Sequence, residues 1–495
     1  MSKTNYVTFI KDNSIALCGA ALIRLQGFIF IYLIIKTVGV TIYGEFILMT
    51  SLLGIVFGIS SFGVGFKTKR FLPSVKSIRK RRDLFYPQFY FNMVSLLSIS
   101  LLFVLFEKQI NIYFFKNEIK FSIWIIPLYL ILYFFYSQGS DYFRYTSRIF
   151  YSRLAAVSYC YSNIALISLS LYIYRGITLN LLLMSSIFAS FLIAVPCFWI
   201  IFSEIGLKFS FYNIKRLTAD IKLGFPLVLS FIVDFILAGS DRYFIAFFMT
   251  ISDVGYYNPG YVLGSLIIFI PKSMSTALPQ LMSKVVDGDK EYESQKMLNY
   301  SLKIFLLLAI PFIFGSILFG KPILTLLANS DVAENAYLVT PIVALGTLFY
   351  GLNIILSNIL FVRMKTFAMF KMNLFASLFN LLANFILLYF FRNIIIAAIT
   401  TFISYFIIFI YIKKIIKKEA WPVDFQPVVI IKSVTASLLM VLTLFGISTK
   451  LGDIGSVGTL TFELILGIVV YFVVLFALRT FSKKELQFVK NCFYK

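Results

Sequence analysis

The sequence predicts an all-α polytopic membrane protein, and three observations support this fold class. First, 60% of the 495 residues are hydrophobic and only 14% are charged, with a mean hydropathy of +0.90. Second, apolar runs long enough to cross a bilayer recur along the whole chain. Third, the basic residues gather in every second segment between these runs. This combination is typical of chains that cross a membrane many times and lies outside the range of soluble domains.

About 14 transmembrane helices are expected, because a spanning helix needs about 20 mostly apolar residues. The expected spans are, in approximate residue numbers, 13–36, 42–66, 86–106, 121–140, 152–174, 180–202, 225–249, 254–282, 303–327, 337–361, 367–391, 394–412, 428–449 and 456–478. The segments between them are short, so no domain outside the membrane is expected to fold on its own.

The distribution of lysine and arginine predicts the orientation of these helices. Thirty-three basic residues lie in the segments on the N-terminal side of the membrane, eight of them in 67–83 alone, and seven lie in the opposite segments. Because basic residues collect on the cytoplasmic side, both ends of the chain are expected in the cytoplasm. The formal net charge of +23 therefore reflects orientation in the membrane, and no nucleic acid is expected as a partner.

Residue types that several kinds of chemistry require are missing from the sequence. The chain has no histidine, and its four cysteines show no CxxC spacing. It also has no glycine-rich phosphate loop of the Walker type. We therefore expect no metal site, no cofactor and no catalytic residues, and we predict that the protein is not an enzyme.

Four charged residues inside the expected spans are candidates for a substrate-binding cavity: Arg24, Asp234, Asp241 and Arg242. A charge at mid-membrane costs about 2.5–3.5 kcal/mol on insertion scales, so such residues usually face a partner or a wet cavity. Asp234 and Asp241 share one helix face, and either is a candidate for coupling to a proton or Na⁺. The structural alternatives are an ion pair of Arg24 with Asp234 or Asp241, and a local pair of Asp241 with Arg242.

A faint internal repeat organises the spans into two halves. Setting Gly44 on Gly255 gives an offset of 211 residues and places Arg24 on Phe235, beside Asp234. Two six-helix halves of the same orientation suit a parallel repeat about an axis normal to the membrane. The expected division is 1–212 for spans 1 to 6, 213–418 for spans 7 to 12, and 419–495 for two extra helices and a cytoplasmic tail.

Prolines also mark one span as irregular. Pro259, Pro271 and Pro279 all fall in the eighth expected span, and each removes a backbone hydrogen bond from a helix. This span is therefore predicted to be the most distorted one.

Two stretches of the sequence carry a resemblance to a known family. The first stretch, residues 223–261, contains the motifs GFP (224–226), DRY (241–243) and DVGYY (253–257). The second stretch, near the start of the chain, contains YG (43–44) and SFGVGFKTKRFLP (61–73). Together with the span count and charge sorting, they resemble bacterial polysaccharide (O-antigen) flippases of the polysaccharide transport family. This family is part of the multidrug/oligosaccharidyl-lipid/polysaccharide exporter superfamily.

The resemblance implies a fold, a cargo and a location. The implied fold is a V of two six-helix lobes, like that of multidrug-and-toxin extruders, with two C-terminal helices added. The implied activity moves an undecaprenyl-diphosphate-linked oligosaccharide from the cytoplasmic to the periplasmic leaflet of the bacterial inner membrane, for O-antigen or other surface polysaccharide. Membrane lipids and the polysaccharide polymerase machinery are the implied partners. Arg24 suits the diphosphate, because a planar guanidinium pairs with phosphate oxygens.

Two other functions are compatible with parts of the sequence. An ion-coupled multidrug antiporter of the same fold favours a cavity with acidic groups and little basic charge, and Arg24 argues against it. A membrane polysaccharide polymerase or ligase places its catalytic residues on long outer loops. Here the longest outer segment, 107–120, is short.

Overall fold

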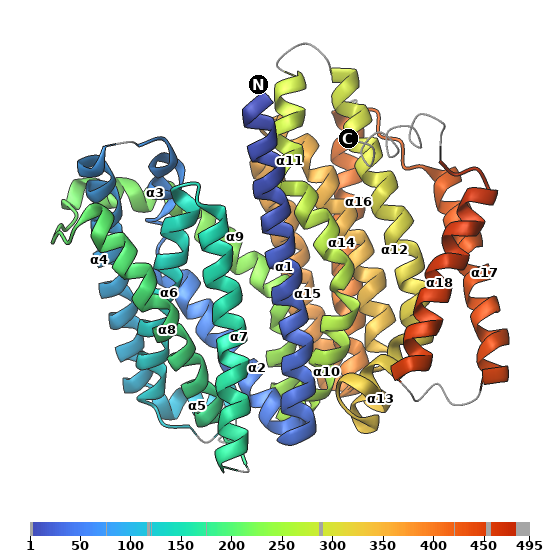
Figure 1. Cartoon of the computed structure of the whole chain (residues 1–495), viewed down its shortest axis with the longest axis horizontal. Coiled ribbons are helices and arrows are strands. Elements are labelled where there is room, and N and C mark those ends of the chain that lie inside the picture. The colour runs from blue at the N-terminus through green and yellow to red at the C-terminus, as the bar shows by residue number, and fades with distance from the viewer. Residues whose placement is uncertain are drawn as a thin grey trace. The chain divides into compact units, whose positions relative to one another are not determined.

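The computed structural model describes residues 3–75, 77–115, 119, 121–174, 176–286, 291–419, 421–451 and 457–481, and every regular element among them is helical (Figure 1). In a bilayer this is expected, because a helix satisfies its own backbone hydrogen bonds where water is absent. The helices are α1 Lys3–Thr37, α2 Val40–Ser60, α3 Phe66–Phe71, η1 Leu72–Ser74, α4 Ile78–Leu105, α5 Glu107–Phe115, α6 Ile125–Tyr145, α7 Ile149–Tyr174, α8 Leu179–Ile205, α9 Ile214–Phe248, α10 Ile251–Gly264, η2 Leu266–Ile268, α11 Phe269–Val286, α12 Glu291–Leu327, α13 Ser330–Ala336, α14 Val339–Val362, α15 Thr366–Phe391, α16 Ile394–Lys418, α17 Pro427–Leu451 and α18 Val457–Ala477.

Twelve helices among the described residues are long and apolar enough to cross a membrane. They coincide with twelve of the expected spans, which confirms an all-α multi-pass membrane protein. The other two expected spans correspond to α6 and to the run α10–η2–α11. Helix α6 is 21 residues long, but its last turns carry Gln138, Asp141 and Arg144, which reduce its hydropathy. A total of fourteen spans stays a prediction.

The eighth expected span is interrupted, as its prolines predicted. Helix α10 ends at Gly264, a 3₁₀ turn follows at Leu266–Ile268, and α11 begins at Phe269. The Thr347 hydroxyl of α14 donates a hydrogen bond to the carbonyl of Gly264, at 3.2 Å. A neighbouring helix thus satisfies one of the backbone groups near the break, which is the condition under which an interrupted helix is tolerated in a membrane.

The chain forms two compact units, Met1–Gly255 and Tyr256–Lys495, which we call unit 1 and unit 2. In unit 1, α6 packs on α4 and α8, and α7 packs on α1 and α8. The centre of this packing is aromatic, because the ring of Phe89 lies 5.1 Å from that of Phe134 and 5.6 Å from that of Phe198. Helix α9, which the repeat assigns to the second half, packs on α2 and α3 in unit 1.

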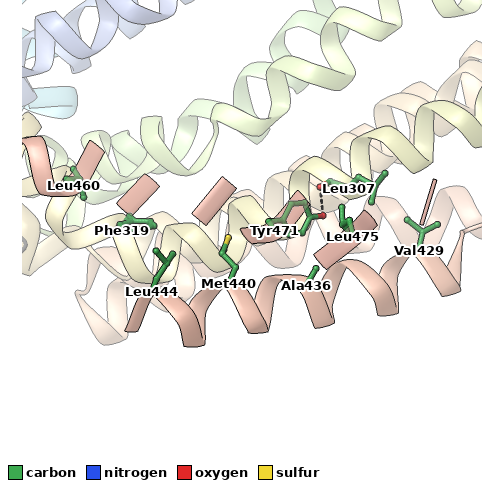
Figure 2. Packing of buried hydrophobic residues seen from close by; sticks show 9 residues of the cluster. All are labelled: Leu307, Phe319, Val429, Ala436, Met440, Leu444, Leu460, Tyr471 and Leu475. Atoms are coloured by element: carbon green, nitrogen blue, oxygen red, sulfur yellow. Dashed lines mark hydrogen bonds between the residues drawn. The ribbon is translucent and has the colours of Figure 1, made fainter. Parts of the chain in front are cut away.

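In unit 2, α14 packs on α11, α12 and α16, and the last two helices, α17 and α18, pack on each other and on α12. Figure 2 shows the apolar cluster that joins these last helices to α12, including Leu307, Met440 and Tyr471. The Tyr471 hydroxyl donates a hydrogen bond to the Leu307 carbonyl at 2.6 Å and lies 2.6 Å from the Ser433 hydroxyl. Apolar packing and interhelical hydrogen bonds of this kind hold helices together in lipid, where the hydrophobic effect between helices is absent.

Within unit 1, the start of α2 crosses the start of α10 at residues that the 211-residue offset pairs. A Cβ on Gly44 would lie 2.3 Å from the carbonyl oxygen of Ile251, and a Cβ on Gly255 would lie 2.2 Å from that of Val40. The hydroxyls of Thr41 and Ser252, also 211 residues apart, are 2.7 Å from each other. The contact is therefore reciprocal, and only glycine allows the two backbones to approach so closely.

Candidate functional site

A polar cavity of about 370 Å³ lies inside unit 1. It is partly open and is lined by the end of α2, the turn that follows it, α3, the middle of α4, the last half of α6 and one residue of α9. Its polar lining consists of Ser60, Ser61, Lys69, Gln88, Asn92, Ser137, Gln138, Asp141 and Tyr145. A concave site with convergent polar groups is the expected form of a small-ligand site.

A tight turn shapes one wall of this cavity. Gly63 has a φ of +73°, a value that favours glycine, and it lies against Gly224 of α9. A Cβ on either glycine would lie 2.1 to 2.2 Å from the carbonyl oxygen of the other. The turn therefore depends on two glycines, one of them in the GFP motif, to bring the start of α3 to the cavity.

The acidic group of the cavity is Asp141, which is held by its own helix. Arg144 Nη2 lies 2.7 Å from Asp141 Oδ1, and the Tyr145 hydroxyl donates to Asp141 Oδ2 at 3.2 Å. These residues are three and four positions apart, so they lie on one face of α6. Lys69 of α3 lines the same cavity and adds a second cation close to this carboxylate.

Two amides of α4 face the cavity with unused hydrogen-bonding capacity. Gln88 and Asn92 are 3% and 5% exposed, and they are four positions apart on one helix face. Neither Gln88 Oε1 nor Asn92 Oδ1 has a hydrogen-bond partner among the residues that the structure describes. Leaving a buried acceptor unsatisfied costs about 1–3 kcal/mol, so native structures rarely retain two side by side without a reason.

Ion pairs join the helix ends around this part of unit 1. Lys67 pairs with the buried Asp220, Lys208 pairs with Asp83 at 2.6 Å, and Arg148 makes two hydrogen bonds to Glu204. These hydrogen bonds raise the pKa of Arg148. Four helices (α3, α4, α8 and α9) supply one residue each to these contacts. The contacts therefore hold the ends of the helices around the cavity in position.

The Asp241–Arg242 pair lies farther along α9 and is local. Asp241 is 2% exposed, and its Oδ1 lies 3.9 Å from Arg242 Nη1. Arg242 Nη1 also donates to the carbonyl of Ala238 at 3.0 Å, and its backbone N–H donates to Asp241 Oδ1. The neighbouring Tyr243 hydroxyl donates to the carbonyl of Leu48, which ties α9 to α2. Of the two structural alternatives, the local pair is the one present.

The four predicted residues differ in burial and in their partners. Asp234 is exposed, seven positions before the buried Asp241 on the same helix. Arg24 is exposed on α1 and makes no ion pair within the described ranges, so the alternative pair with Asp234 or Asp241 is not formed. The cavity residues Lys69, Gln88, Asn92, Asp141 and Tyr145 were not among the predicted site residues. The sequence signal that could have identified them is the presence of polar residues at the start of the expected span 86–106 and at the end of the expected span 121–140.

Metal binding has no support in the described part of the chain. No group of three or more aspartate, glutamate, cysteine or histidine side chains there is placed to hold a metal ion.

Comparison with solved structures shows which known fold the chain shares. The lipid II flippase MurJ in an inward closed conformation is similar over 92% of this chain and 97% of that chain, with 19% identity and a TM-score of 0.75. An inward-facing multidrug resistance MATE family transporter of the MOP superfamily is similar over 80% and 98%, with 13% identity and a TM-score of 0.65. A MOP superfamily transporter from Pyrococcus furiosus is similar over 83% and 95%, with 14% identity and a TM-score of 0.55. At these identities the likeness shows the fold, which is that of MurJ and the MATE transporters.

The family follows from the sequence. Residues 43–332, more than half of the chain, match the model of the family described as polysaccharide biosynthesis protein. The chain belongs to this family, which confirms the resemblance found in the sequence. Among curated protein sequences, none matches the chain.

Proposed function

We propose that the protein is a flippase for undecaprenyl-diphosphate-linked oligosaccharides, which it moves from the cytoplasmic to the periplasmic leaflet of the bacterial inner membrane. The observation that carries this proposal is a match to a polysaccharide biosynthesis family on a chain with the fold of membrane transporters. The product would supply O-antigen or another surface polysaccharide, and the polymerase machinery would use it. We assign no catalytic residue, because transport across the membrane breaks no bond in the cargo.

The chemistry of the cargo agrees with the distribution of polar groups. The sugars and the diphosphate cannot enter the hydrocarbon core without a polar path, whereas the polyprenyl tail can remain in lipid. Arg24, exposed at the middle of an apolar helix, is the proposed contact for the diphosphate. An apolar cavity of about 350 Å³ in unit 2, between α12 and the last two helices, suits a section of the tail.

Orientation and division follow the sequence patterns. We propose that both termini are cytoplasmic, that residues 1–212 and 213–418 are the two halves of the repeat, and that 419–495 adds the last two helices and a tail. Asp234 and Asp241 are proposed to contact the cargo or to bind a coupling ion, and Arg242 holds Asp241 in place.

A deletion strain of the source bacterium tests this function. The deletion is expected to abolish surface polysaccharide and to trap radiolabelled lipid-linked repeat units on the cytoplasmic side. The intact gene supplied on a plasmid is expected to restore both. Normal surface polysaccharide with no trapped intermediate, in a strain that has no second copy of such a gene, would contradict the proposal.

An ion-coupled multidrug antiporter is the second candidate, because MATE transporters share the fold. Under this alternative the deletion strain would become sensitive to cationic drugs and would keep its surface polysaccharide. Measuring drug sensitivity in the same strain separates the two functions.

A further inference from the structure

We propose that the polar cavity of unit 1 is a saccharide subsite, which binds one uncharged sugar ring through Gln88, Asn92 and the groups around Asp141. This inference rests on the proposed function, since it names the part of the cargo that the cavity recognises. It assigns no role to the exposed Arg24 or to the Asp241–Arg242 pair, which lie elsewhere on unit 1.

The first step of the argument is the pair of unused acceptors. Gln88 and Asn92 line the cavity, and their amide oxygens are buried and have no hydrogen-bond partner within the described ranges. They need a ligand that donates hydrogen bonds. Sugar hydroxyls do this, and asparagine and glutamine amides on neighbouring helical turns present their oxygens to the same ring.

The second step compares a sugar with the two simplest charged ligands. A phosphate would accept hydrogen bonds from Lys69 and from the amide N–H groups, but it would face the Asp141 carboxylate in the same lining. A small cation would share the cavity with the Lys69 ammonium. Lys69 and Asp141 together give the lining no net charge, and its donors and acceptors are mixed, which matches a polyhydroxylated ring better than either ion.

The third step concerns size and the apolar walls. The volume of about 370 Å³ is larger than one hexose needs, so a single sugar ring fits with room for bridging water molecules. Phe57, Phe66 and Phe134 contribute aromatic surface to the lining. A pyranose ring has apolar C–H faces between its polar edges, so a pocket of aromatic walls with a few fixed polar groups complements it.

The experiment uses the full-length protein in lipid nanodiscs and measures saturation-transfer NMR. The probe is an equimolar mixture of glucose, galactose, N-acetylglucosamine and rhamnose, with sodium phosphate followed in parallel by its ³¹P linewidth. The unmodified protein is expected to transfer saturation to the ring protons of at least one sugar. Asn92→Leu and Gln88→Leu are each expected to lower that signal at least fivefold, and the ³¹P linewidth is expected to be the same in all samples.

Asn163→Leu is the matched control. Asn163 is also a buried amide in unit 1, but its side chain donates to the Ser186 hydroxyl at 3.2 Å and it does not line the cavity. The control is expected to lower the thermal unfolding temperature and to keep the sugar signal. Asn92→Leu is expected to keep or raise the unfolding temperature, because it replaces an unsatisfied amide.

The outcomes separate the subsite from the proposed function. Sugar signals that are absent, or that survive both cavity substitutions, overturn the subsite, even where the deletion strain accumulates lipid-linked repeat units. Broadening of the ³¹P line that Asn92→Leu abolishes overturns it in favour of an anion site. Loss of the sugar signal in Asn92→Leu with an unchanged unfolding temperature supports the subsite, even where the deletion strain exports normally and the proposed function fails.

Discussion

At the scale of single residues, burial separates two carboxylates that the sequence treats as equivalent. Asp234 and Asp241 are two helical turns apart, yet Asp234 is exposed and Asp241 is 2% exposed. A buried carboxylate needs a fixed partner, and Arg242 supplies one from the next position in the chain. Asp241 is thus held by its neighbour on α9, and the more exposed Asp234 is the better placed of the two to contact cargo or solvent.

This difference predicts that the two substitutions affect stability differently. Asp241→Asn is expected to lower the stability of the purified protein by about 3 kcal/mol, because it removes the negative charge beside a largely buried guanidinium. Asp234→Asn is expected to leave the thermal unfolding temperature unchanged. The measurement is thermal unfolding in detergent, alongside export in cells. Equal unfolding temperatures for the two variants would show that the Asp241–Arg242 pair does not hold α9 in place.

Arg24 gives a second prediction at this scale. Arg24→Ala is expected to abolish export while the amount of protein in the membrane stays normal, because an exposed side chain without an ion pair has no structural role to lose. Arg24→Lys is expected to keep partial activity, since it retains the charge and loses the bidentate geometry.

Lys36→Ala, at the end of the same helix, is the control and should export normally. Surface polysaccharide and membrane protein level are measured together. Full complementation by Arg24→Ala would remove this residue from the substrate path.

At the scale of elements, the crossing of α2 and α10 depends on two glycines. Gly44→Ala and Gly255→Ala are each expected to lower the unfolding temperature, because the new Cβ would lie 2.2 to 2.3 Å from a carbonyl oxygen of the other helix. The double variant is expected to show a smaller fall in unfolding temperature than the sum of the two single falls, because the first substitution already separates the helices.

Gly54→Ala is the matched control on α2, where no atom lies within 4 Å of the added Cβ. It is expected to be neutral or to stabilise by up to about 1 kcal/mol, because alanine favours the helix over glycine. If Gly54→Ala lowers the unfolding temperature as much as Gly44→Ala does, the close crossing of α2 and α10 is not the reason why glycine is needed at position 44.

The elements themselves were largely predictable, and the cavity was not. Apolar length fixes where a spanning helix lies, and the proline cluster identified the span that is interrupted between α10 and α11. The cavity joins Gln88 and Asn92 of α4 to Lys69 of α3 and to Asp141 of α6, which lies about 50 residues farther along the chain than the two amides. Such a site depends on which helices pack together and in what rotation, which hydropathy does not encode. The sequence also identified the four charged residues inside the spans, but it could not predict which of them are buried and which are exposed.

At the scale of the whole molecule, the charge pattern and the helix count predict orientation. A reporter that is active only in the periplasm should stay inactive when fused after Lys495. The same reporter should be active when fused after Phe115, beyond three predicted crossings. Activity after Lys495 would mean that the number of crossings is odd, and would leave α6 or the α10–η2–α11 run short of a full span.

The reciprocal contact between Gly44 and Gly255 also has a consequence for the origin of the chain. Gly44 contacts Ile251, and Gly255 contacts Val40, which lies 211 positions before Ile251. Each of the two segments therefore presents to the other the same surface that it receives. That is the isologous geometry of a two-fold dimer. Under the proposed repeat, a gene for one half alone would have made a self-complementary protein in which a single glycine met the backbone of its own copy. Duplication and fusion of that gene would then have preserved the contact while freeing each half to diverge, so that a guanidinium stands in the first helix of one half and a carboxylate close to the matching place in the other.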